Sequence, residues 1–237
     1  MSDNRQLLIE NLSKRYGSRT VLDIDRLSLD FGRSYALIGP NGSGKSTLLK
    51  ALSGVTDASS GTISVPGASK ASRLSVGYMP QKSYVFGLSV FRNVAMALDS
   101  TGITRSEVRR RVEVVLEEVG MLEFIDSRGD GLSGGEAQRI AIARMLVQDR
   151  DVLLLDEPTA SMDITGTMLA EEALKRYQKR TGCLAIVATH APSQARRIAD
   201  EIVMLSDGRV VEQGATKDVL SHPSSEEGQR FLSYWAI

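Results

Sequence analysis

A glycine-rich segment near the start of the chain has the composition of a phosphate-binding loop. Residues 39–47 read GPNGSGKST, which fits the pattern G-x-x-x-x-G-K-[ST] at Gly39, Gly44, Lys45 and Ser46. In this pattern backbone N–H groups surround a phosphate at the start of a helix, the lysine reaches the β- and γ-oxygens, and the hydroxyl binds Mg²⁺. The plainer interpretation is a glycine turn before a helix. It loses weight because an apolar run precedes the loop and a helical stretch follows it.

A second glycine pair raises a question. Residues 132–139 read LSGGEAQR and lead into the helical stretch RIAIARMLVQ. Glycines after a serine at the start of a helix also suit a phosphate oxygen, because the helix N-terminus presents free N–H groups. One nucleotide needs only one such loop, so the second requires a separate explanation.

Two acids follow a strongly apolar run. Residues 152–158 read VLLLDEP, with Asp156 and Glu157 at the end of a predicted buried strand. Loops gather at the carboxyl ends of strands in doubly wound folds, which would place these acids beside the phosphate loop. Asp156 is predicted to hold Mg²⁺ through water, and Glu157 to polarise an attacking water. The alternative is an acid pair in an ordinary turn, and the order of the two motifs makes it less attractive.

Three further residues are weaker candidates on their own. His190 ends another apolar run, where a γ-phosphate contact is geometrically possible, although a lone histidine is more often structural. Gln81 lies in a loop, where a glutamine is usually only solvated. Tyr16 could stack on a purine, but tyrosines in strands mostly pack.

The remaining pattern predicts the elements that position these residues. Apolar runs of strand length alternate with helical stretches after residue 132, which indicates a parallel sheet covered on both faces. Residues 7–38 and 60–79 contain further strands with turns. TRSE at Thr104–Glu107 is a capping box for a helix with one apolar face (Val108, Val112, Val115, Leu116 and Val119). Asp207 and Gly208 supply the turn of a hairpin.

Composition excludes several classes of protein. The 237 residues carry 29 basic and 29 acidic side chains, so no overall charge attracts nucleic acid or anionic lipid. The single cysteine, Cys183, rules out an internal disulfide framework and lies in an apolar run, where a buried thiol is expected. Neither a membrane-spanning stretch nor a secretory signal is visible, so a cytoplasmic location is expected.

These motifs, in this order, resemble the nucleotide-binding subunit of ATP-binding cassette (ABC) transporters over about residues 6–220. The resemblance implies an α/β P-loop NTPase with a mostly parallel core sheet, an N-terminal antiparallel β subdomain and an inserted α-helical subdomain. The whole chain, 1–237, would be a single ABC ATPase domain. Residues 1–81 and 132–222 would form the RecA-like catalytic core with its β subdomain, 82–131 the helical subdomain, and 223–237 a C-terminal tail.

The resemblance also assigns roles to residues. Glu157 would be the general base, with His190 and Lys45 on the γ-phosphate and Gln81 sensing Mg²⁺ and the attacking water; Asp163 would end the D-loop. The nucleotide would contact Tyr16 and the loop Gly39, Pro40, Asn41, Gly42, Ser43, Gly44, Lys45, Ser46 and Thr47, and Mg²⁺ would contact Ser46, Gln81 and Asp156. Ser133, Gly134, Gly135 and Glu136 form the signature, which in this family closes over ATP held by the opposite subunit. The second glycine pair would thus serve a neighbour's nucleotide.

Two positions depart from the family pattern. Residue 136 is Glu136 where glutamine is more common, so a charge near phosphate could temper affinity. Met162 replaces the usual leucine of the D-loop, a mild apolar exchange.

The partners implied by the resemblance are a second cassette subunit, in the simplest case an identical copy, integral membrane permease subunits and a solute-binding protein, but no nucleic acid. The expected ligands are ATP and Mg²⁺, and the expected location is peripheral, on the inner face of the cell membrane. The segment 78–98 is most similar to cassettes of small-solute or oxyanion importers, including tungstate-type systems. The short C-terminal tail argues against the sugar-importer type.

Two other functions share the same motifs. The first alternative is the ATPase of a cell-division or lipoprotein-release complex, which does mechanical work without importing a solute. A soluble ABC ATPase of DNA repair or translation is less favoured, because the sequence has neither long coiled coils nor two fused cassettes.

Overall fold

The computed structural model describes residues 5–67 and 74–235 and consists of two sheets flanked by helices. Residues 1–4, 68–73 and 236–237, which belong to the predicted ranges 1–81 and 223–237, lie outside the described part. The first sheet is antiparallel, in the order β2 (Arg19–Asp30), β1 (Gln6–Tyr16), β4 (Ser60–Ser64).

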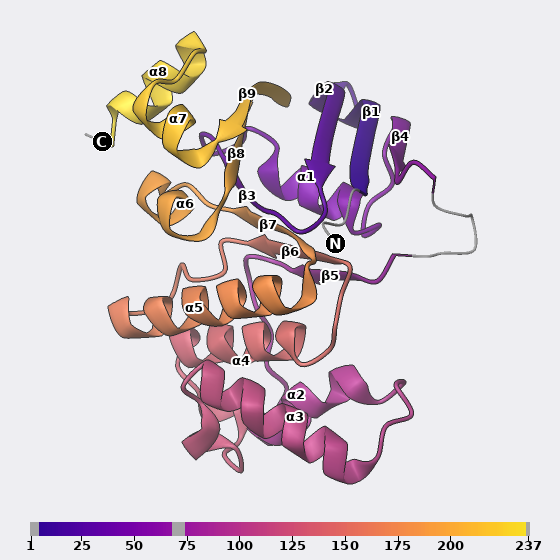
Figure 1. Ribbon diagram of the computed structural model, residues 1–237, viewed down its shortest axis with the longest axis vertical. Coiled ribbons are helices and arrows are strands. Elements are labelled where there is room, and N and C mark those ends of the chain that lie inside the picture. Colours follow the sequence, from indigo (N-terminus) through magenta and orange to yellow (C-terminus); the bar gives the residue numbers. More distant parts are fainter. Residues whose placement is uncertain (1–4, 68–73, 236–237) are drawn as a thin grey trace.

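The central sheet has six strands in the order β5 (Val76–Met79), β6 (Val152–Asp156), β7 (Leu184–Ala188), β3 (Ser34–Ile38), β8 (Glu201–Ser206) and β9 (Arg209–Ala215). The first five pair in parallel, and β9 closes the edge antiparallel to β8. The three-stranded antiparallel sheet lies at the upper right in Figure 1, above β5 and β6 of this larger sheet. The predicted fold class, a mostly parallel core with an N-terminal antiparallel sheet and helical regions, is confirmed. The predicted hairpin is also confirmed, since β8 and β9 are joined at Asp207 and Gly208.

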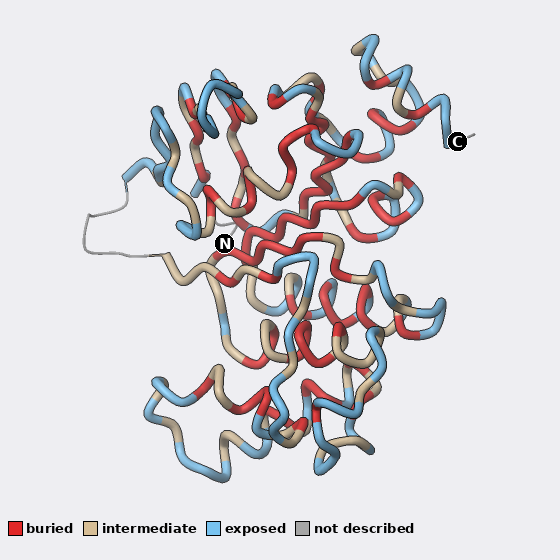
Figure 2. The backbone as a smooth tube through the Cα atoms, turned by 180° about the vertical axis from the view of Figure 1, so that it is seen from behind, coloured by how far each residue is buried: buried red, intermediate tan, exposed pale blue. Residues whose placement is uncertain are grey.

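Alternate residues of β6 face two separate cores. Val152 and Leu154 of β6 face a core shared with the antiparallel sheet and with α1 (Lys45–Leu52), whereas Leu153 and Leu155 face the helices on the other side. Such strands are buried on both faces, which explains why VLLLD is apolar without alternation. Figure 2 shows this buried centre as a continuous band through the molecule.

The helices on the second face form two layers. Against the sheet lie α4 (Gly134–Leu146) and α5 (Ile164–Thr181), and beyond them lie α2 (Val90–Ala95) and α3 (Arg105–Glu118), as Figure 1 shows. Three short 3₁₀ turns lie in the same region, at Met96–Leu98, Leu122–Phe124 and Gly129–Gly131. The predicted boundary near residue 82 falls between β5 and α2, and the one near residue 131 falls at the end of the third 3₁₀ turn. The division into subdomains stays a prediction.

Half of the predicted capping box is present at the start of α3, because the Glu107 carboxylate accepts from Arg110 and Arg111. The hydroxyl of Thr104 accepts a hydrogen bond from the Glu107 N–H at 3.3 Å. Four of the five apolar residues expected on one face of this helix region are fully buried, and the fifth, Val108, packs against the same core (buried: Val112, Val115, Leu116 and Val119).

Three short helices were not predicted from the sequence. They are α6 (Pro192–Ile198), α7 (Thr216–Ser221) and α8 (Glu226–Ser233), the last of which lies in the expected C-terminal tail. Helices of six to eight residues are not stable alone, so their formation depends on burial of side chains such as Leu220 and Leu232 against β3 and β8. Among the described residues, no helix is long and apolar enough to cross a membrane.

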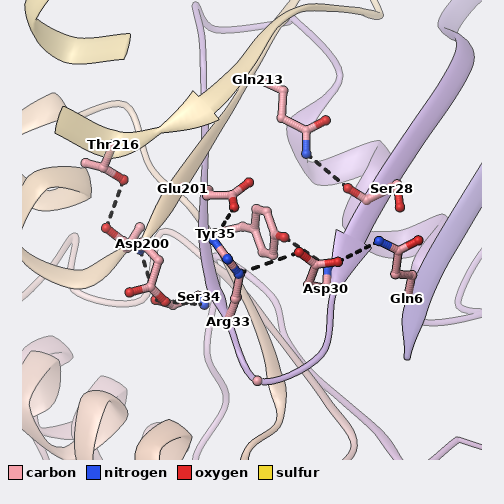
Figure 3. Close-up of polar contacts among 12 residues, drawn as sticks. Gln6, Ser28, Asp30, Arg33, Ser34, Tyr35, Asp200, Glu201, Gln213 and Thr216 are labelled. Carbon is pink, nitrogen blue, oxygen red and sulfur yellow. Dashed lines mark hydrogen bonds and ion pairs between the residues drawn. The ribbon is translucent and has the colours of Figure 1, made fainter. Parts of the chain in front are cut away.

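The amino ends of the central strands are held by polar side chains, which Figure 3 shows. The N–H and hydroxyl of Ser34, at the start of β3, both donate to Asp200 Oδ2, at 2.9 and 2.7 Å. The Arg33 guanidinium forms ion pairs with Glu201 of β8 and, at 3.5 Å, with Asp30 at the end of β2. These contacts fix β3, β8 and β2 at one edge, and the carboxyl ends of β3 and its parallel neighbours meet at the opposite edge.

Candidate active site

The predicted catalytic and phosphate-binding residues lie at the carboxyl ends of four strands, at one edge of the central sheet. Gly39 follows β3 and Gln81 follows β5. Asp156 ends β6 with Glu157 next to it, and His190 follows β7. Because these strands are parallel, their carboxyl ends meet at the same edge, where ligands bind in open α/β sheets.

The phosphate-type loop is held in its shape from two sides. Gly44 has a left-handed backbone, with φ of 108°, immediately before α1, and a Cβ there would lie 2.8 Å from the Leu22 side chain. The loop therefore needs glycine both for its conformation and for its contact with β2. Gly208, in the hairpin turn, donates its N–H to the Ser43 carbonyl at 3.0 Å, a support that the motif alone does not reveal.

Lys45 is buried at the first position of α1. Its ammonium donates to the carbonyls of Gly39 and Pro40, at 2.8 and 3.0 Å, so it lies across the loop. Burial lowers the pKa of Lys45, and the nearby carboxylates of Glu157 and Asp156 act against that shift. A buried cation held between carbonyls beside an open cavity is positioned to attract phosphate oxygens.

A cavity of about 340 Å³ opens between the loop and the carboxyl ends of β5 and β6. Its lining includes nine of the predicted residues and two that sequence analysis missed (Asn41, Gly42, Gly44, Lys45, Ser46, Thr47, Gln81, Asp156 and Glu157, with Arg19 and Val21). Arg19 and Val21 belong to β2, which reaches the loop only through the packing of the antiparallel sheet. No local motif marks them.

The oxygen donors in this cavity fit Mg²⁺. The Ser46 hydroxyl, the Gln81 amide and the Asp156 carboxylate all line it, and Mg²⁺ prefers hard oxygen ligands, with one or two carboxylates, water and substrate phosphates. Across residues 5–67 and 74–235 there is no cluster of three or more His, Cys, Asp and Glu side chains suited to a metal. One carboxylate and two neutral oxygens leave coordination positions for water and phosphate oxygens.

Glu157 has an unusual backbone. Its φ is +50°, in the left-handed region, which costs a non-glycine residue on the order of 1 kcal/mol. Its N–H donates to the Ala188 carbonyl at 3.0 Å, and its own carbonyl accepts from Gln138 Nε2 at 3.4 Å. Hydrogen bonds from two different elements thus hold the strained residue whose carboxylate lines the cavity.

His190 lies beside the cavity and contacts it through Glu157. Its Nδ1 is 2.9 Å from Glu157 Oε1, a hydrogen bond between the ends of β6 and β7. The histidine side chain is 56% exposed and the glutamate side chain only 12%. The structure therefore brings the two predicted residues together and leaves the imidazole accessible.

Tyr16 does not line the cavity. It lies at the end of β1 with 52% of its surface exposed, and the Lys14 ammonium is 5.0 Å from its ring centroid. The Tyr16 ring is thus not packed in the protein core, unlike most tyrosines in strands. Its stacking on a purine stays a prediction.

The second glycine pair begins α4 and lies outside this cavity. Ser133 is the N-cap of α4 and forms a reciprocal capping box with Glu136, whose Oε2 accepts from the Ser133 N–H and hydroxyl at 2.7 Å each. These hydrogen bonds from Ser133 lower the pKa of Glu136. The acid that replaces the more common glutamine is thus bound to the signature serine of its own chain.

The signature packs against the predicted D-loop. A Cβ on Gly135 would lie 2.9 Å from the Ser161 carbonyl oxygen, so the two backbones touch. Asp163 is the N-cap of α5 and accepts from the Gly166 N–H at 2.7 Å, and Met162 packs against the helical core.

Gln138, which sequence analysis passed over, connects these parts. It is buried in α4, where it accepts from the Ser161 N–H at 2.9 Å and donates to the Glu157 carbonyl. A glutamine within the signature was visible in the sequence, but its partners lie about twenty positions away and could not be identified.

Comparisons with known proteins agree with this geometry. Residues 22–160 match the ABC transporter family. The chain is 38% identical to the phosphate import ATP-binding protein PstB 2 of Natronomonas pharaonis, over 97% of this chain and 87% of that protein. It is 36% identical to the tungstate uptake system ATP-binding protein TupC of Peptoclostridium acidaminophilum, over 87% of this chain and 97% of the relative. A solved structure of an ATP-binding subunit of an ABC transporter superposes with a TM-score of 0.81 at 27% identity, covering 96% of this chain and 99% of that one.

The contact between the signature and the D-loop predicts different effects at its two glycines. Gly135→Ala should lower the free energy of unfolding by about 1–3 kcal/mol, because the new Cβ overlaps the Ser161 carbonyl. Gly134→Ala is the matched control, since its Cβ would meet nothing closer than 3.7 Å and alanine favours a helix. Urea unfolding of both variants measures the difference. Equal stability of the two would contradict the close contact.

Proposed function

Because this chain belongs to the ABC transporter family and is an ATP-hydrolysing subunit of it, we propose that it powers the import of a small oxyanion through separate membrane subunits. ATP would bind in the cavity at the carboxyl edge of the central sheet. The observation that carries the proposal is that the phosphate loop, Gln81, Asp156 and Glu157 line one cavity.

The phosphate loop binds and orients the nucleotide in this proposal. The N–H groups of residues 42–47 surround the β-phosphate at the positive end of α1. Lys45 redirects its ammonium from the carbonyls of Gly39 and Pro40 to the β- and γ-oxygens, which are stronger acceptors. The depressed pKa of Lys45 rises again once phosphate charge is present.

Glu157 acts as the general base. A water beside the γ-phosphate donates its proton to the Glu157 carboxylate while its oxygen bonds to phosphorus. The bond from phosphorus to the β,γ-bridging oxygen breaks, which leaves ADP and inorganic phosphate. The hydrogen bond from His190 and the fixed backbone of Glu157 orient the carboxylate.

Mg²⁺ would be held by Ser46, Gln81 and Asp156, and when bound it supplies charge neutralisation on the phosphate oxygens. The three residues come from α1, from the segment after β5 and from the end of β6. Each of these side chains therefore also helps to orient the triphosphate in the cavity.

The signature serves the nucleotide of a second subunit. Ser133, Gly134, Gly135 and Glu136 lie at the start of α4, yet none of them lines the cavity of their own chain in its described part. A two-fold pair of chains would place each signature over the partner's nucleotide and give two composite sites. ATP then stabilises the dimer and hydrolysis releases it.

Relatives support the choice of solute. ATP-binding subunits of this family work with membrane permease subunits, and the two curated relatives named above are described as phosphate import and tungstate uptake proteins. Phosphate and tungstate are both tetrahedral oxyanions. We therefore propose that this subunit works with permease subunits and a binding protein for such an anion. Its proposed location is the inner face of the cell membrane.

The role of Glu157 predicts a separation of binding from hydrolysis. Glu157→Gln should lower the ATPase rate about 100- to 10,000-fold, because a general base contributes that range, while ATP binding persists. Lys45→Ala should instead weaken ATP binding itself. Phosphate release and equilibrium nucleotide binding measure the two effects, with Glu113→Gln as the matched acid control, because Glu113 lies on the exposed face of α3. A Glu157→Gln protein that hydrolyses at the native rate would remove Glu157 as the base.

If each site combines the phosphate loop of one subunit with the signature of the other, a defect in the loop and a defect in the signature should complement each other when they are on different subunits. Subunits with Ser133→Arg are mixed with subunits with Lys45→Ala and the ATPase rate is measured. In the mixed dimer one site carries both defects and the other carries none, so activity should reappear although each variant alone is inactive. The same low rate in the mixture as in the separate variants would rule out the cross-subunit arrangement.

The proposed solute predicts a defect in anion uptake. Cells that lack this chain should lose most high-affinity uptake of phosphate, sulfate, molybdate or tungstate, and the native chain but not Glu157→Gln should restore it. Radiolabelled uptake measures the loss for each anion. Unchanged uptake of all four would reject the importer and favour the cell-division or lipoprotein-release type.

A further inference from the structure

The only tryptophan of the chain lies against His190. The rings of Trp235 and His190 are 6.2 Å apart between centroids and inclined at 42°, within the range in which aromatic rings attract one another. The imidazole therefore has Glu157 at its Nδ1, 2.9 Å away, and an indole beside its ring. In the described part of the chain it has no other ring or side-chain hydrogen-bonding partner.

Trp235 is held in place by a helix that is itself anchored. Leu232 of α8 is buried, Phe231 packs against the same core, and the Trp235 N–H donates to the Leu232 carbonyl at 3.0 Å. Trp235 therefore lies just after the last turn of α8, which is anchored by the buried Leu232. The Trp235 residue is 39% exposed, so the core does not enclose its indole ring. The His190 ring is nevertheless a defined neighbour of that indole.

A carboxylate from β9 fixes the start of the same helix. Glu212 accepts hydrogen bonds from the N–H and hydroxyl groups of both Ser224 and Ser225, at 2.6–3.2 Å. Burial acts to raise the pKa of Glu212, but these hydrogen bonds outweigh it and the pKa is lowered, which keeps the group ionised. The hydroxyl of Ser225 also caps α8 by accepting from the Gly228 N–H.

We propose that Trp235 is a positioning residue for hydrolysis, which holds the His190 imidazole against Glu157. The inference rests on the proposed roles of Glu157 and His190. A half-exposed histidine on a loop has several rotamers available, and a neighbouring aromatic ring restricts them without touching the nucleotide. The position of α8 therefore sets the orientation of the histidine. A change in α8 would alter the rate of hydrolysis and leave ATP affinity unchanged.

Steady-state ATPase measurements on the full chain test the proposal. Trp235→Ala should lower kcat about three- to tenfold with KM within twofold, the range expected from losing one aromatic pair. Trp235→Phe should recover at least half of the rate, because it restores a ring. Tyr234→Ala is the matched control, since Tyr234 is the adjacent aromatic residue, is 85% exposed and should leave kcat unchanged.

Fluorescence provides a readout that does not depend on activity. Because Trp235 is the only tryptophan, its emission reports the ring contact directly. His190→Ala should change that emission in the nucleotide-free protein, and Tyr234→Ala should not.

The proposal is overturned if Trp235→Ala keeps the native kcat, if phenylalanine fails to restore the rate, or if the emission is insensitive to His190→Ala. These outcomes are separable from a failure of the proposed function. An active Glu157→Gln protein rejects the catalytic assignment, whereas an inactive one with a fully active Trp235→Ala protein rejects only the positioning role.

Discussion

The parallel pairing of β3, β5, β6 and β7 is the constraint on which the site depends. The segments after these strands carry the phosphate loop, Gln81, Glu157 and His190, and parallel strands must end at a common edge. The opposite edge is fixed by Ser34 and its neighbours, so the edge with the proposed active site can hold loops while the sheet stays paired. The contacts that hold the amino ends of the strands are thus separate from the residues proposed to react.

Strain at the site is supported from outside the cavity. Glu157 holds a left-handed backbone because Ala188 accepts its N–H and Gln138 donates to its carbonyl. Gln138 belongs to the helix that begins with the signature, and it also binds Ser161 of the D-loop. The proposed base is therefore mechanically connected to the surface on which a second subunit would act. In the proposed dimer, opening or closing would act on Glu157 through these hydrogen bonds.

Glu136 illustrates how local structure changes the meaning of a substitution. As a charge near phosphate it is expected to weaken ATP binding, but its carboxylate already accepts two hydrogen bonds from Ser133. It therefore stabilises the start of α4 by the same interaction that occupies the serine hydroxyl. A γ-phosphate from a second subunit would have to compete with Glu136 for that hydroxyl proton.

The sequence by itself determined the parallel core sheet, the loop around Lys45 and the place of Asp156 and Glu157 at the end of a strand, because these depend on local patterns: apolar strands, glycines at fixed spacing and acids after a buried run. It also marked Thr104 as the N-cap of α3, which is a contact within one helical turn. Only the tertiary structure decided that Arg19 lines the cavity, that Gln138 supports Glu157 and that Trp235 lies against His190. Gln138 and Glu157 are 19 positions apart, His190 and Trp235 are 45 apart, and Arg19 shares its cavity with residues as distant in sequence as Glu157. No local rule of spacing or propensity specifies which distant side chains will meet.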